Sequence, residues 1–208
     1  MWCRRVGVAT IGAVLALGAV CLDAQPASYQ PGAKQAVVET SAGAFIIDLR
    51  PDLAPRQTAL FMKLAGDGTY VGTTFFRMVR RGVIQGGDPL SKDPAKRALY
   101  GSGGFNQVKA EPRAPKMLKG AVAAVLLPGK PDSAGAQFFV AVSDQAGLDG
   151  QYTVFGEIAD GMDVVQAISE TPVDASGVAT ARVEIRSVTI RDTPPPVPEP
   201  FTTESDAE

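Results

Sequence analysis

Apolar residues along this chain recur mainly in short runs with strand-like alternation, separated by glycine, proline and acidic turns. The clearest pair is formed by residues 36–40 and 44–49, two β-branched segments joined by Ser41-Ala42-Gly43, and this pattern predicts a β-hairpin. The same criteria predict further strands at 74–79, 83–85, 121–127, 137–142, 153–158 and 182–191.

Only two segments have the pattern of a helix. Pro55–Ala65 begins with proline and is followed by Gly66, as is typical of helices, and 161–168 places three apolar side chains on one helical face. The segment 88–119 is rich in glycine, lysine and proline, and we expect a long loop there that is functional or packed against the domain. Many short strands with two short helices favour an antiparallel barrel or sandwich over a parallel α/β fold.

The N-terminus has the features of a secretory signal peptide covering residues 1–24. Two arginines precede an uncharged apolar run, 6–22, which is short for a bilayer span of about 20 residues. Cleavage is expected after Ala24. A lipoprotein signal at Cys21 and an uncleaved anchor are the alternatives. Export predicts a periplasmic or cell-envelope protein whose mature form, expected to be a monomer, has no membrane span.

Two polar, proline-containing segments flank the predicted folded domain, which covers residues 35–192. Residues 25–34 are expected to form a linker. Residues 193–208 combine five prolines with acidic residues, a composition that predicts an extended, disordered tail.

Composition excludes several classes of function. A formal net charge of −2 argues against a nucleic-acid partner, and the absence of histidine excludes Ser-His-Asp, Cys-His and HExxH zinc chemistry. Both cysteines lie in the leader, so the folded domain has no disulfide or thiol site. We expect no metal and no cofactor. No tight carboxylate pair stands out, and Asp48, Asp52 and Glu157 are expected on solvated faces or at caps.

A few polar residues occur inside otherwise apolar strands. Arg77 lies among aromatic and β-branched residues, Gln85 follows shortly before a Gly-Gly turn, and Gln137 precedes Phe138 and Phe139. Adjacent residues of a strand face opposite sides, so one of the two phenylalanines is expected in the core and the other at a site. The pattern predicts a groove with a few polar groups in an apolar wall.

Three segments, FFRMVRRGVIQGGDP, SAGAQFFVAVSD and LDGQYTVFGEI, resemble in order and spacing the cyclophilin-type peptidyl-prolyl cis/trans isomerases, in particular an exported bacterial member. The similarity extends from about Gln35 to Asp192. It implies a mostly β fold, a closed eight-stranded antiparallel β-barrel capped by two α-helices, with the substrate groove on its outer surface. The implied partners are proline-containing peptide segments of unfolded or folding proteins.

The resemblance also implies roles for individual residues. Arg77 matches the family's catalytic arginine, and Gln85 matches the glutamine that orients it. The residues that match substrate-binding positions are Val83, Leu126, Gln137, Phe139, Leu148 and Tyr152. The implied function is acceleration of rotation about X-Pro peptide bonds. The alternative is a cyclophilin-like module or chaperone that binds proline segments with weak or no turnover.

Four positions depart from the family pattern. Gly82 and Val83 stand where the family usually has Phe-Met, which removes apolar area from the proline pocket. Leu126 replaces an Asn or Arg whose contact is largely through the backbone, and the loop 127–132 is longer by about two residues. Gly147 replaces a tryptophan associated with cyclosporin affinity, which implies weak binding of that drug.

Overall fold

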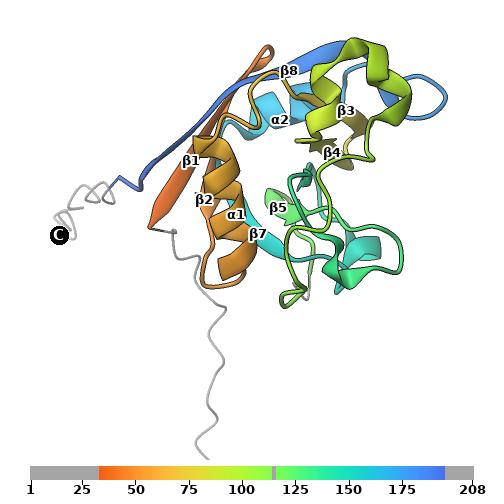
Figure 1. Cartoon of the computed structure of the whole chain (residues 1–208). Helices are drawn as coiled ribbons and strands as arrows, with labels where there is room; N and C mark the ends of the chain where they lie inside the picture. Colours follow the sequence, from red (N-terminus) through yellow and green to blue (C-terminus); the bar gives the residue numbers. More distant parts are fainter. Residues whose placement is uncertain (1–32, 114–115, 195–208) are drawn as a thin grey trace, which may run out of the picture. The chain divides into compact units, whose positions relative to one another are not determined.

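The computed structural model describes residues 33–113 and 116–194, in which eight antiparallel strands form a closed barrel (Figure 1). The predicted leader and nearly all of the predicted linker and tail lie outside these residues. The order around the barrel is β1-β2-β7-β5-β6-β4-β3-β8. The strands are β1 (Lys34–Thr40), β2 (Gly43–Leu49), β3 (Thr74–Val79), β4 (Val83–Gly86), β5 (Ala121–Ala124), β6 (Phe138–Ala141), β7 (Val154–Asp160) and β8 (Val178–Asp192). The predicted fold class is confirmed.

Two α-helices accompany the barrel, α1 (Pro55–Gly66) and α2 (Met162–Ser169), each within one residue of the predicted bounds. The interior is filled by aromatic rings. Phe138 packs edge-on against Phe61, Tyr70 and Phe75, with ring centroids 5.6–5.8 Å apart. Because Phe138 points into the core, its neighbour Phe139 points outward, as the alternation of a strand requires.

The segment predicted as a long loop is held in place by two buried carboxylates. Asp88 accepts hydrogen bonds from the backbone N–H groups of Leu90, Gly101 and Gly103, and the segment contains two short 3₁₀ helices, η1 (Pro89–Lys92) and η2 (Pro94–Leu99). Glu111 accepts from the first backbone N–H groups of α1, at 2.8 Å each, where no residue of the helix itself supplies a cap. The carboxylate at this helix N-terminus also complements the helix dipole.

Two strand boundaries differ from the prediction by three or more residues. The strand β5 ends at Ala124, although the apolar run continues to Leu127, because the following residues leave the sheet and line surface pockets. The strand β8 begins at Val178, four residues before the predicted start, since its first residues pair with Arg77 of β3 through an irregular register.

The expectation for Asp48 is wrong. Its side chain is buried and accepts a 2.7 Å hydrogen bond from Gln35 Nε2. Burial raises the pKa of this carboxyl, an effect that the nearby Arg50 guanidinium partly opposes. Asp52 and Glu157, in contrast, form partly exposed ion pairs with Arg50 at 2.7 and 3.2 Å, as surface carboxylates would.

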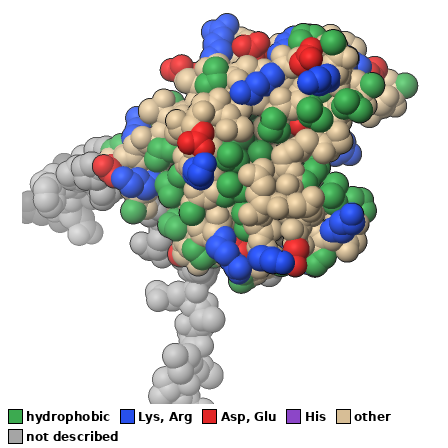
Figure 2. Space-filling view, viewed as in Figure 1, with side chains coloured by type: hydrophobic (Ala, Val, Ile, Leu, Met, Phe, Trp, Pro, Cys, Tyr) green, Lys and Arg blue, Asp and Glu red, His purple; other side chains and the backbone are tan. Residues whose placement is uncertain are grey.

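The described part of the chain also bears on surface charge, membrane spans and metal ligands. On the face drawn in Figure 2, lysine and arginine side chains are scattered among apolar and acidic ones. Within residues 33–113 and 116–194, no helix is long and apolar enough to cross a membrane. In the same part of the chain, no group of three or more carboxylate, cysteine or histidine side chains is arranged to hold a metal ion.

Candidate active site

The site is built on one row of paired residues that crosses four strands. Arg77 of β3 pairs with Gln85 of β4, Gln85 pairs with Phe139 of β6, and Phe139 pairs with Ala123 of β5. Directly paired residues of antiparallel strands share one face, and Phe139 faces outward, so the row lies on the outside of the barrel. The strand register therefore brings a cation, an amide and an aromatic ring together from three separate segments.

A pocket of about 250 Å³ opens over this row. Six of the eight site residues predicted from the sequence line it: Arg77, Val83, Gln85, Phe139, Leu148 and Tyr152. Three further residues complete the wall: Val79, Val125 and Gln145. The pocket has a polar end at Arg77 and Gln85, and its other walls are largely apolar.

A chain of side-chain hydrogen bonds fixes the polar end. Arg77 Nη1 donates to Gln85 Oε1 at 3.4 Å, Gln85 Nε2 donates to Gln137 Oε1 at 2.9 Å, and Gln137 Nε2 donates to the carbonyl of Gly103 at 2.7 Å. The Gly103 carbonyl can only accept, so the NH₂ group of Gln137 must face it. This orientation of the Gln137 amide fixes the orientation of the Gln85 amide, whose oxygen then faces Arg77.

Gln137 and Leu126, the other two predicted site residues, lie outside this pocket. Gln137 is fully buried behind Gln85, where it can orient Gln85 but presents no surface to a ligand. Leu126 lines a neighbouring pocket that shares Tyr152 with the first. The sequence pattern alone could not separate these positions, because both residues belong to apolar segments next to the site.

The apolar end of the pocket rests on a second hydrophobic cluster, distinct from the barrel core. It contains Val83, Met117, Ala121, Ala123, Phe139, Ala141 and Val154. Tyr152 packs edge-on against Phe139, with ring centroids 5.0 Å apart and planes at 83°. Both rings are thereby held in place, and the alanines of β5 and β6 leave room above the sheet.

Gly82, where a phenylalanine is usual, is covered by a neighbour. A Cβ atom at Gly82 would lie 2.8 Å from Val79 Cγ1 and 3.2 Å from the carbonyl oxygen of Val79. The Val79 side chain therefore takes part of the space that the missing ring would need, and it lines the pocket. Sequence reasoning missed Val79, although its place at the end of the Arg77 strand was a usable signal.

The arrangement supports binding of an apolar ring beside a cationic hydrogen-bond donor. It offers no nucleophile with an adjacent base and no pair of carboxylates, so it can polarise or orient a bound group but not attack it. Arg77 remains exposed and therefore accessible to a ligand, while Gln85 behind it is buried.

A closed eight-stranded barrel with such a pocket on its outer face defines a cyclophilin-like protein. The sequence agrees: residues 36–190 match the family described as cyclophilin type peptidyl-prolyl cis-trans isomerase/CLD. The chain belongs to this family.

Two curated relatives show how far the similarity extends. The peptidyl-prolyl cis-trans isomerase CYP18-2 of Arabidopsis thaliana is 30% identical over 173 residues, which cover 82% of this chain and 100% of the relative. The peptidyl-prolyl cis-trans isomerase-like 4 of Cryptococcus neoformans is 31% identical over 79% of this chain. The chain spans only 35% of the length of that second relative.

Solved structures confirm the fold. A cyclophilin type peptidyl-prolyl cis-trans isomerase from Cryptosporidium parvum, crystallised in the presence of the dipeptide Ala-Pro, superimposes with a TM-score of 0.68 at 25% identity. The match covers 76% of this chain and 99% of that chain. A cyclophilin from Hirschia baltica matches 74% of this chain and 73% of its own, with a TM-score of 0.61 at 20% identity.

Proposed function

We propose that this chain is a peptidyl-prolyl cis/trans isomerase whose active site is the pocket over the Arg77–Gln85–Phe139 row. The observation that carries the proposal is the register of β3, β4 and β6, which places an oriented guanidinium beside an apolar pocket. Relatives of the same family are named as such isomerases.

The reaction needs no covalent step. Rotation about a peptide bond is opposed by about 18–20 kcal/mol of barrier, and X-Pro bonds exchange over tens to hundreds of seconds. As the bond twists, amide resonance is lost and the imide nitrogen regains a lone pair. A site accelerates rotation when it binds this twisted form more tightly than either planar form.

Both ends of the pocket contribute to tighter binding of the twisted form. The apolar walls at Phe139, Val83 and Leu148 hold the proline ring, so that the preceding carbonyl group can turn. Arg77 donates a hydrogen bond to the imide nitrogen once its lone pair develops. Gln85 limits the positions that the exposed guanidinium can take, which lowers the entropy cost of reaching the twisted state.

The predicted leader supports a cellular role for this activity. We propose that the protein is exported, acts as a monomer in the periplasm or cell envelope, and assists folding of other exported proteins that contain proline. Because the folded domain has neither cysteine nor histidine, this activity would need no thiol or metal chemistry.

A second candidate function is a proline-segment binding module with weak turnover. Gly82 and Val83 favour it, because a pocket with less apolar area grips the ring less firmly. Val79 offsets part of this loss, and for this reason we place catalysis first.

The experiment is magnetisation-exchange NMR on an Ala-Pro peptide, which resolves its cis and trans forms. The parent chain should accelerate exchange, and the Arg77→Ala variant should lose most of this acceleration. Arg186→Ala, which removes an exposed cation outside the pocket, from the part of β8 that pairs with β1, is the matched control and should match the parent. A folded parent that shifts peptide resonances without accelerating exchange would establish the binding module instead.

A further inference from the structure

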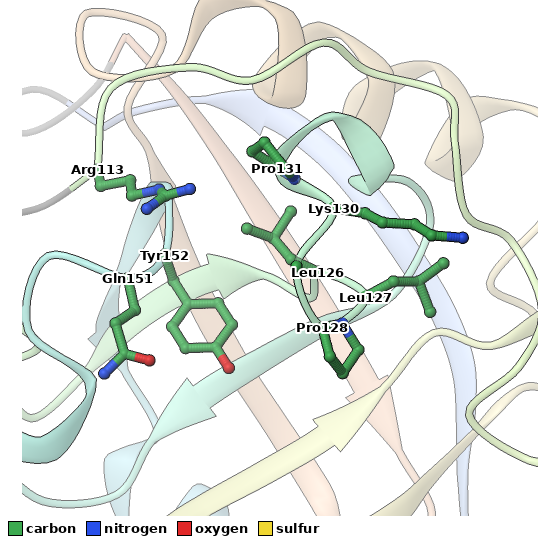
Figure 3. A pocket seen from close by; sticks show the side chains of 9 residues that line it. Arg113, Leu126, Leu127, Pro128, Lys130, Pro131, Gln151 and Tyr152 are labelled. Atoms are coloured by element: carbon green, nitrogen blue, oxygen red, sulfur yellow. The ribbon is translucent and has the colours of Figure 1, made fainter.

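A second pocket, of about 490 Å³, adjoins the proposed proline pocket. It lies between Arg113, the loop 126–131 and the Gln151-Tyr152 pair (Figure 3). Tyr152 lines both pockets, and Val125, in the wall of the first, directly precedes Leu126 in the wall of the second. A peptide held by its proline in the first pocket can therefore reach the second.

The second pocket is positively charged. The described residues that line it include no acidic side chain, and the two basic ones, Arg113 and Lys130, are both exposed. Among the residues that the structure describes, neither forms an ion pair with a carboxylate. In Figure 3 the Arg113 guanidinium extends over Gln151 and Tyr152, whereas the Lys130 ammonium points away from Leu126 at the opposite rim.

Two carboxylates that lie close in sequence to this pocket are already engaged. Glu111 is buried and binds the N-terminus of α1. Asp132 accepts from the backbone N–H of Ala110 at 2.8 Å and pairs with Lys109 at 3.6 Å. These contacts hold both carboxylates in other roles, so the charge of Arg113 is left for a ligand.

Apolar side chains of the loop 126–131 line part of the pocket. Leu126 and Pro128 contribute side chains that can cover the methylene groups of a ligand residue. A pocket with a guanidinium on one side and apolar side chains on the other suits a ligand side chain with a short aliphatic stem and a terminal carboxylate, since Arg binds carboxylates through two parallel hydrogen bonds.

We propose that this pocket is a specificity subsite for an acidic residue close to the proline of the substrate, with Arg113 as the residue that binds its carboxylate. The inference rests on the proposed function, because the proline pocket supplies the anchor. An extended peptide advances about 3.3 Å per residue, so the acidic residue should lie within about three positions of the proline.

The test uses Ala-Pro peptides with a single Glu placed at each of the three positions before and after the Ala-Pro unit, and matched peptides with Gln. Both kcat/KM for cis/trans exchange and Kd from NMR titration are measured with the full chain. At one position, the Glu peptide should have a kcat/KM about three- to tenfold higher and a Kd about three- to tenfold lower than the Gln peptide. Both differences should shrink at 0.5 M salt.

Arg113→Gln should remove this advantage while leaving values for the Gln peptides unchanged, and Lys130→Gln should reduce it less. Arg186→Gln, which removes the same charge elsewhere, should leave it intact. Equal values for Glu and Gln peptides at every position, or an advantage that survives in Arg113→Gln, would overturn the proposal. If no peptide exchanges faster, the isomerase proposal fails, and the Kd comparison still decides the subsite.

Discussion

Replacing Gln85 by alanine should remove the hydrogen bond that restrains Arg77, the proposed catalytic residue. In the structure Gln85 is the middle member of the chain that runs from Arg77 to Gln137 and the Gly103 carbonyl. The substitution removes the acceptor that restrains Arg77 and the donor that satisfies Gln137 Oε1. We therefore expect both a loss of activity and a loss of stability, with separate causes.

The two magnitudes follow from the geometry. A hydrogen bond to a charged group is worth about 1.5–3 kcal/mol, and the 3.4 Å length of the Arg77–Gln85 contact places it at the lower end, which corresponds to about a tenfold fall in kcat/KM. An orphaned buried acceptor costs about 1–3 kcal/mol. Gln85 is 9% exposed, so water can reach the gap and the lower value of about 1 kcal/mol is expected.

The assay is NMR exchange of an Ala-Pro peptide, combined with urea unfolding of the same samples. The control is Gln35→Ala. Gln35 is also a buried glutamine, and it donates to Asp48 and accepts from Arg191 away from the pocket. This variant should lose stability but keep its kcat/KM. If Gln85→Ala retains parental kcat/KM, or if Gln35→Ala loses as much activity, the role of the hydrogen-bond chain is refuted.

Three further predictions concern stability. Phe138→Ala, which removes the ring that packs on three others, should cost about 3–5 kcal/mol in urea unfolding. Glu111→Gln should cost about 1 kcal/mol, because the charged cap of α1 is lost. Asp48 has a raised folded-state pKa, so its stabilising contribution is complete below the unfolded pKa of about 3.9 and is lost as pH rises through the folded pKa. The stability of Asp48→Asn relative to the parent should therefore increase as pH rises above about 4.

Each of these predictions has a result that would contradict it. For Phe138 it is a cost below about 1 kcal/mol, which would show that the surrounding rings collapse into the cavity. For Glu111 it is an unchanged unfolding midpoint at low salt, where the helix dipole is least screened. For Asp48 it is a difference between variant and parent that does not vary with pH.

Much of the fold followed from local pattern. The hairpin, both helices and the opposite directions of Phe138 and Phe139 depend on periodicity and turn residues, which act over a few positions of the chain. The end of β5 did not follow, because Val125, Leu126 and Leu127 are as apolar as strand residues although they line pockets outside the sheet. Asp48 was also misjudged, since its burial depends on a partner from β1.

The sequence by itself determined which residue types the site could contain and, through its ordered motifs, the family to which the chain belongs. Only the tertiary structure decided that Gln137 stands behind Gln85 and that Arg113 and Tyr152 line one pocket. The physical reason is how far apart in the sequence the interacting residues lie. Periodicity reports which way a side chain faces, whereas contacts between residues tens of positions apart depend on strand register and barrel closure.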